Sequence, residues 1–147
     1  MSEPELDAEI SRVDPNRLIN YNNHRWRREV LDWEEVGLWC GSTGAKGMPV
    51  HWCYGSLKET TDLVYGAQRN GTLSSQAPDV DAAMRGMSSI VRFISQEEML
   101  CPIVLPAPRV RTNPCCRPIA LGFDDGNMRA LTLALAGKQK IPTYVGR

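Results

Sequence analysis

Residues 24–55, HRWRREVLDWEEVGLWCGSTGAKGMPVHWCYG, shape the interpretation of the whole chain because they hold all four tryptophans and both histidines. The stretch divides into an amphipathic segment, residues 24–40, and a glycine-rich loop. The apolar positions that share one face of an α-helix are Trp26, Val30, Trp33, Val36, Gly37 and Cys40. This periodicity predicts a helix over residues 24–40. The stretch resembles a core element joined to a binding surface more than a catalytic centre.

Three arginines, Arg25, Arg27 and Arg28, surround Trp26 at the start of this expected helix. Cations at a helix N-terminus oppose the helix dipole, which costs a few tenths of a kcal/mol unless an anion lies nearby. A phosphate is one candidate for that anion. The acidic residues of the N-terminal arm and Asp32 are the other candidates, and they are favoured here.

The glycine-rich loop is expected to fold back onto the helix through His51, Trp52 and Tyr54. It is not a phosphate-binding P-loop, since GSTGAKG lacks the final Gly-Lys-Ser/Thr and no strand is expected before it.

Three more helices are expected further along the chain. Ser56 and Glu59 form a capping box that starts a helix ending between Gly66 and Gly71. Residues 79–101 show the clearest helical periodicity, and they follow a flexible connector at residues 69–78. Asp124 or Asp125 caps the last helix, which stops at Gly137.

The expected fold is a single, mainly α domain spanning residues 1–147. It comprises a small helical domain with a glycine-rich aromatic loop and a proline-rich irregular segment before the last helix. Residues 102–118 contain five prolines, which exclude a long helix there. Residues 1–13 are expected to be a flexible acidic arm, and residues 138–147 a flexible basic tail.

The charges balance overall but not along the chain. There are 17 basic and 17 acidic residues, giving a formal net charge of zero. From residue 99 onward, seven bases face two acids, which leaves about +5 on the last third. This asymmetry suggests nucleic acid as a partner, and a solvated surface remains the alternative.

Cysteine usage and hydropathy predict a cytoplasmic protein. No apolar run approaches the roughly 20 residues that span a bilayer, and the acidic N-terminus is unlike a signal peptide. Five cysteines, with no CxxC pair, favour reduced thiols over a disulfide framework.

Neither a cofactor nor an enzymatic activity is expected, because no catalytic motif is present. Zinc is a weaker alternative to buried free cysteines, since the spacings of the candidate ligands are unusual for a tetrahedral site. Those candidates are Cys40, His51, Cys53, Cys101, Cys115 and Cys116.

Residues 115–137 are the best candidate for a nucleic-acid-reading unit. In a helix-turn-helix, residues 117–121 would end the first helix, Gly122 would make the turn, and residues 127–136 would form the recognition helix.

The order of these sequence features resembles the order found in bacteriophage late-gene antitermination proteins of the Q type, in the all-helical branch without a zinc finger. The similarity covers roughly residues 25–136. It rests on W-x5-W-C from Trp33 to Cys40, on Lys46-Gly47-Met48-Pro49, on a long amphipathic helix and on Ile119-Ala120-Leu121-Gly122. The family usually has two residues between Ile-Ala and Leu-Gly, and this chain has none.

The resemblance implies a factor that binds double-stranded DNA near a late promoter, loads onto bacterial RNA polymerase and suppresses pausing and termination. The residues it assigns to DNA are Arg109, Arg111, Arg117, Asn127 and Arg129. The residues it assigns to a polymerase-facing or self-associating surface are Trp33, Trp39, Lys46, His51 and Trp52.

The competing hypothesis is a small phage structural or adaptor protein that self-assembles through its tryptophan-rich loop and proline-rich arm. An inhibitor that binds a host protein is a third class compatible with the composition.

Overall fold

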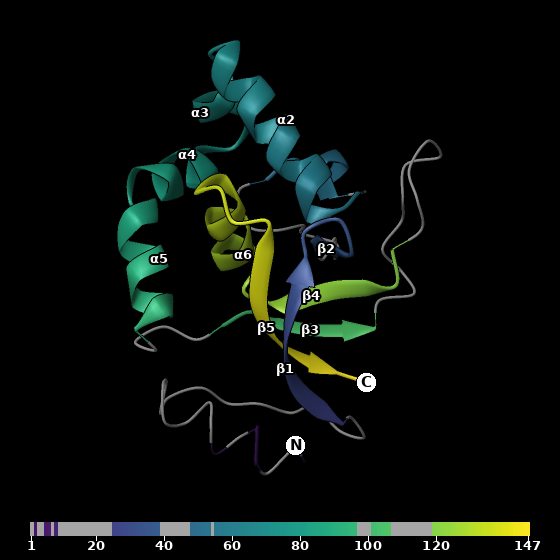
Figure 1. The fold of residues 1–147 in the computed structure, drawn as a ribbon. Helices are drawn as coiled ribbons and strands as arrows, with labels where there is room; N and C mark the ends of the chain where they lie inside the picture. The colour runs from purple at the N-terminus through teal and green to yellow at the C-terminus, as the bar shows by residue number, and fades with distance from the viewer. Residues whose placement is uncertain are drawn as a thin grey trace.

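The structure, a computed structural model, describes residues 2, 5, 6, 8, 25–38, 48–53, 55–96, 101–106 and 119–147. The elements in chain order are β1 (Trp26–Asp32), β2 (Val36–Leu38), the 3-10 helix η1 (Val50–Cys53), α2 (Leu57–Arg69), α3 (Leu73–Gln76), α4 (Pro78–Arg85), α5 (Met87–Ser95), β3 (Ile103–Pro106), β4 (Leu121–Asp125), α6 (Asn127–Leu135) and β5 (Lys140–Gly146) (Figure 1).

Five strands form one mixed sheet in the order β1-β5-β3-β4-β2. β1 and β5 are antiparallel, β5 and β3 parallel, β3 and β4 antiparallel, and β4 and β2 parallel. The fold is therefore α/β, and the prediction of a mainly α, all-helical protein is wrong. The same finding excludes the all-helical architecture that the resemblance implied.

The segment predicted as a helix over residues 24–40 contains β1 and β2. The apparent helical stripe is not a buried face, because Trp26 is fully buried whereas Val30 is 65% exposed. The buried residues are instead those that meet β4, β5 and the helices: Trp26, Leu31, Val36 and Leu38. Pairing with distant strands overrides the local periodicity here.

The sheet curls strongly. β1 and β2 lie at opposite edges, yet only residues 33–35 connect them. In a flat sheet, the four spacings between neighbouring strands would hold β1 and β2 about 19 Å apart. The chain from Asp32 to Val36 can span at most about 14 Å, so the sheet must bend to bring its two edges together. The Glu35 N–H also donates to the Asp32 carbonyl at 2.9 Å, which tightens the turn. Accordingly, β3 and β4 run across the direction of β1 and β5 in Figure 1.

β5 replaces the predicted flexible basic tail at residues 138–147. It is an interior strand between β1 and β3, and Ile141 and Val145 are fully buried. In an antiparallel ladder, hydrogen-bonded pairs of residues alternate with pairs that are not hydrogen-bonded. Arg25 and Arg147 form a hydrogen-bonded pair, so the pair of Val30 and Pro142 is one that is not. Pro142, which has no N–H, is therefore tolerated opposite β1.

α6 is the central helix of the core. Residues 130–135 are all buried, and α2, α4, α5 and β5 contact the helix. Gly137 follows it with φ +95°, a conformation suited to glycine at a helix C-terminus. The last predicted helix is thus confirmed, but its predicted cap is wrong: the N-cap residue is Gly126, and neither Asp124 nor Asp125 caps the helix. β4 begins at Leu121, where the predicted first helix would end, and includes Gly122, the predicted turn, so residues 119–135 do not form a helix-turn-helix.

Two further helix predictions compare well with the structure. α2 begins at the predicted cap, where the Glu59 N–H donates to Ser56 Oγ at 3.2 Å. The long helix predicted over residues 79–101 is present as α4 and α5, which are separated at Gly86. Glycine is the residue of lowest helix propensity after proline, which accounts for the interruption.

The remaining predictions concern the connector at residues 69–78, the N-terminal arm and membrane spans. The connector contains the short helix α3, and Leu73 and Ala77 are buried in the core. Of residues 1–13 the structure describes residues 2, 5, 6 and 8, and Leu6 is buried in the core. Within the described part of the chain, no helix combines the length and apolar character needed to cross a bilayer.

Candidate functional site

The residues predicted to contact DNA do not gather on one described surface. Arg109, Arg111 and Arg117 lie outside the described residues. Asn127 and Arg129 lie in the first turn of α6. Their assignment to DNA remains a prediction.

Arg129 has a structural contact of its own. Its Nη2 lies 3.1 Å from Asp125 Oδ2, and the two side chains are only 19% and 24% exposed. The guanidinium also lies against Gly126, where an added Cβ would be 2.6 Å from Nη2. Gly126 itself has φ +89°, which favours glycine. Arg129 therefore joins the end of β4 to the start of α6.

The predicted partner-binding residues are also divided. Trp39 and Lys46 lie outside the described residues. Trp52 is 4% exposed and belongs to the core, so it presents little surface to a partner. Trp33 is half-buried beneath the Lys58 ammonium, 6.0 Å from the ring centroid. His51 is exposed and meets Trp52 edge-on at 6.2 Å.

Metal binding finds no support within the described residues. They contain no group of three or more histidine, cysteine, aspartate or glutamate side chains that could hold a metal ion. Cys101 is buried. Cys40, Cys115 and Cys116 lie outside the described residues.

Two charged surfaces lie at opposite ends of the β1–β5 ribbon. The first, which we call the arginine cluster, consists of Arg25, Arg27, Arg28 and Arg147, all exposed. Arg25 and Arg147 lie directly opposite each other, because their backbones exchange two hydrogen bonds of 2.9 Å. Side chains of such a pair project from the same face of the sheet, and Arg27 follows on that face.

A single carboxylate offsets the arginine cluster among its strand neighbours. Arg147 Nη2 donates to both oxygens of Glu29 at 3.2 Å. Arg28 points to the other face and stacks over Tyr144, 5.6 Å from the ring centroid. Among the described residues of these two strands, four arginines accompany one glutamate. Like charges directly opposite in a sheet are destabilising, so an anion bound between Arg25 and Arg147 would relieve the repulsion.

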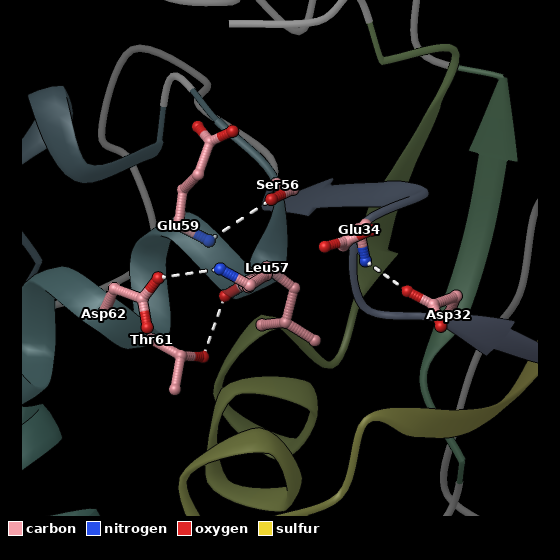
Figure 2. A network of polar contacts seen from close by, with 8 residues as sticks. Asp32, Glu34, Ser56, Leu57, Glu59, Thr61 and Asp62 are labelled. Carbon is pink, nitrogen blue, oxygen red and sulfur yellow. Dashed lines mark hydrogen bonds and ion pairs between the residues drawn. The ribbon is translucent and has the colours of Figure 1, made fainter.

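The second surface lies at the other end of the ribbon, where residues 33–35 meet α2 (Figure 2). Asp32 organises the turn. Its Oδ1 accepts from the Glu34 N–H at 2.9 Å, and its Oδ2 accepts from Lys140 Nζ at 2.8 Å. The hydrogen bond to Asp32, with the attraction of its charge, raises the pKa of Lys140 above its usual value.

α2 completes this second surface. The Lys58 N–H donates to the Trp33 carbonyl at 3.1 Å, which fixes the helix start against the turn. Lys58 Nζ then pairs with Asp62 at 3.2 Å. The Glu59 carboxylate lies over Gly55, where an added Cβ would be 1.8 Å from Oε2. A side chain at position 55 would displace that carboxylate.

A pocket of about 230 Å³ opens between the turn and α2, and we call it the acidic pocket. The residues lining it include Glu34, Ser56, Lys58, Glu59 and Ile119. Its described lining residues include two glutamates and one lysine, and the Lys58 ammonium pairs with Asp62.

Sequence reasoning found part of the arginine cluster and missed the acidic pocket. It noted the arginines around Trp26 but placed them on a helix. It also placed Arg147 in a flexible tail, because nothing near position 147 indicates a partner strand at residues 25–32.

A scan against protein-family models, a search of curated proteins and a search of solved structures found no match for this chain.

Proposed function

We propose that this protein binds double-stranded DNA through the arginine cluster and acts as a transcription antitermination factor on bacterial RNA polymerase. The observation that carries the DNA contact is the clustering of four exposed arginines at one end of β1 and β5, in a chain of zero formal net charge. Exposed arginines at the edge of the sheet can contact DNA phosphates, which position a protein without specifying sequence.

The antitermination part of the proposal rests on the resemblance. Its W-x5-W-C motif begins at Trp33, in the turn after β1, and includes β2 as far as Leu38, so the resemblance supports a function and not a fold. The arginine cluster supports DNA contact independently. Assembly through the tryptophan-rich loop is less well supported, because Trp52 is buried.

The DNA contact is tested by measuring affinity for duplex DNA as a function of salt, by fluorescence anisotropy. Each phosphate contact contributes roughly 0.9 to the slope of log affinity against log salt. Arg27→Gln and Arg147→Gln are each expected to weaken binding and lower the slope by about 0.9. Arg85→Gln is the matched control, since Arg85 lies exposed on α4. Equal slopes for all of these proteins would contradict the assignment.

Antitermination is tested by in vitro transcription with bacterial RNA polymerase on a template carrying a phage late promoter and an intrinsic terminator. The expected result is more read-through with the wild-type protein, and less with Arg27→Gln. Read-through that does not change when the protein is added to its cognate template would refute this part of the proposal.

A further inference from the structure

Gly86 separates α4 from α5 within a single amphipathic pattern. The apolar positions that continue at helical spacing across the break, all buried or half-buried, are Val80, Met84, Met87, Val91 and Ile94. Gly86 has φ −106° and ψ 12°, and its N–H donates to the Ala83 carbonyl at 3.1 Å, three residues back instead of four. α5 begins at this break without a side-chain cap. The break therefore depends on glycine and not on a capping interaction.

Gly86 also divides the fold into two segments. We call residues 25–85 the first segment and residues 87–147 the second segment. The second segment supplies β5, β3 and β4, which are neighbours in the centre of the sheet, and the first segment supplies β1 and β2 at its two edges. α4 and α5 run in different directions where the segments join (Figure 1). The first segment thus completes both edges of a sheet whose centre belongs to the second.

Contacts between the two segments hold the fold together. β1 pairs with β5, β2 pairs with β4, and α2 and α4 pack against α6. The Tyr65 hydroxyl donates to the Leu135 carbonyl at 2.6 Å, and Lys140 Nζ lies 2.8 Å from Asp32 Oδ2. None of these contacts requires the two segments to belong to the same chain.

We propose that Gly86 is a hinge at which two copies of the chain exchange segments, so that the first segment of each copy packs on the second segment of the other. At the opened hinge, α4 and α5 join into one helix over residues 78–95. The exchange re-forms every contact between the segments with the partner copy and changes only the hinge. The partner is a second copy because it carries the β1 and β2 that complete this sheet.

Joining the two helices favours the exchanged form. In a continuous helix, the first-turn N–H groups of α5 donate to the last carbonyls of α4, which gives intrahelical partners to groups that helix ends lack. Association costs translational freedom, so the exchanged dimer is favoured by high protein concentration. Each arginine cluster in the dimer combines Arg25, Arg27 and Arg28 of one copy with Arg147 of the other. The inference does not depend on the proposed DNA contact, and none of its measurements involves DNA.

The first test is refolding from urea at high protein concentration, followed by size-exclusion chromatography with light scattering. We expect a dimer beside the monomer, with the same circular dichroism spectrum. The isolated dimer should stay dimeric on dilution and return to monomer only in urea that unfolds the monomer, because β1 and β2 must leave the sheet. A dimer that dissociates on dilution alone would overturn the proposal.

Variants at the hinge should shift the ratio of dimer to monomer. Gly86→Ala meets no obstacle, since an added Cβ lies 4.0 Å from the nearest atom, the Ala83 carbonyl oxygen. It should raise the dimerisation constant by up to about 30-fold, because alanine favours a helix by about 1 kcal/mol at each of two hinges. Insertion of Gly-Ser-Gly after Gly86 should lower the constant, because a longer connector no longer favours the joined helix.

Gly66→Ala is the matched control, since Gly66 lies within α2 and an added Cβ there also has open space. It should leave the ratio of dimer to monomer as in the wild type. No dimer from either the wild type or Gly86→Ala, or equal dimerisation constants for the two, would overturn the proposal.

Crosslinking of a mixed dimer is the decisive measurement. Isotope-labelled and unlabelled chains are refolded together, and a carbodiimide then joins the Lys140 amine to the Asp32 carboxylate as an amide. Mass spectrometry of the digested dimer should find crosslinked peptides that pair a labelled with an unlabelled segment, whereas the monomer should give none. Lys140→Ala should remove this crosslink. A dimer that contains only same-isotope pairs would show that the segments have not been exchanged.

Discussion

β1 and α2 are held in place by partners at very different distances along the chain. α2 is fixed at its start by Ser56, whose Oγ accepts from the Glu59 N–H three residues later. β1 is fixed by β5, and the Thr143 hydroxyl that donates to the Glu29 carbonyl lies 114 residues away. The helix therefore has a local cause in the sequence, whereas the strand exists only because a distant segment pairs with it.

The difference explains why the two segments respond differently to local change. A helix cap can be removed while the rest of the core holds the helix in place. An edge strand such as β1 has no comparable local support, because its ladder hydrogen bonds are all made to another segment. Three variants test this contrast, in order of decreasing effect.

Removing residues 138–147 should have the largest effect and prevent cooperative folding. Burial of Ile141 and Val145 alone is worth about 3–6 kcal/mol, a large part of the roughly 5–15 kcal/mol by which domains are stable. β1 would also lose its partner. The measurement is urea unfolding followed by circular dichroism. Lys138→Ala/Gln139→Ala, which keeps the strand, is the control. A truncated protein that unfolds like the full chain would show that residues 138–147 are a dispensable tail.

Trp26→Ala should lower the free energy of unfolding by about 3–5 kcal/mol, because this fully buried ring would leave a cavity. Val30→Ala in the same strand should change it by less than about 0.5 kcal/mol, because Val30 is 65% exposed. A helix over residues 24–40 would bury Trp26 and Val30 on the same face. Similar losses of unfolding free energy for Trp26→Ala and Val30→Ala would therefore favour the helix. Thermal and urea denaturation measure both variants.

Ser56→Ala should lower the free energy of unfolding by less than Trp26→Ala does, by about 1 kcal/mol, because it removes only the cap of α2. Helical circular dichroism should be nearly unchanged, since Leu57 and Val64 still anchor the helix in the core. Ser74→Ala, at an exposed position on α3, is the control and should be neutral. Loss of the folded state on Ser56→Ala would mean that the cap supports more than α2.

The sequence predicted the helices that carry their own signals. Ser56 marks the start of α2, and Gly137 marks the end of α6. The five strands were missed for a physical reason. β2 and β3 are short, with three and four residues, and β1 mixes buried and exposed positions in a pattern that also fits a helical period. β5 carries lysines and a proline, which locally resemble a tail.

The candidate surfaces were predictable only in part. Arg25, Arg27 and Arg28 are adjacent in sequence and were recognised as a basic group that needs an anion. Their neighbour Arg147 becomes visible only when β5 pairs with β1. The acidic pocket joins Glu34, Glu59 and Ile119, which come from three separate parts of the chain. No local pattern brings these three side chains together.

The pairing of β1 with β5 also has a consequence during synthesis. At about 5–20 residues per second, the ribosome needs roughly 6–23 seconds to add the 114 residues that separate Glu29 from Thr143. Throughout that interval the nascent chain carries β1 without its ladder partner, and Trp26 and Leu31 remain uncovered by β5. Pairing of β1 can therefore be completed only after β5 has left the ribosome.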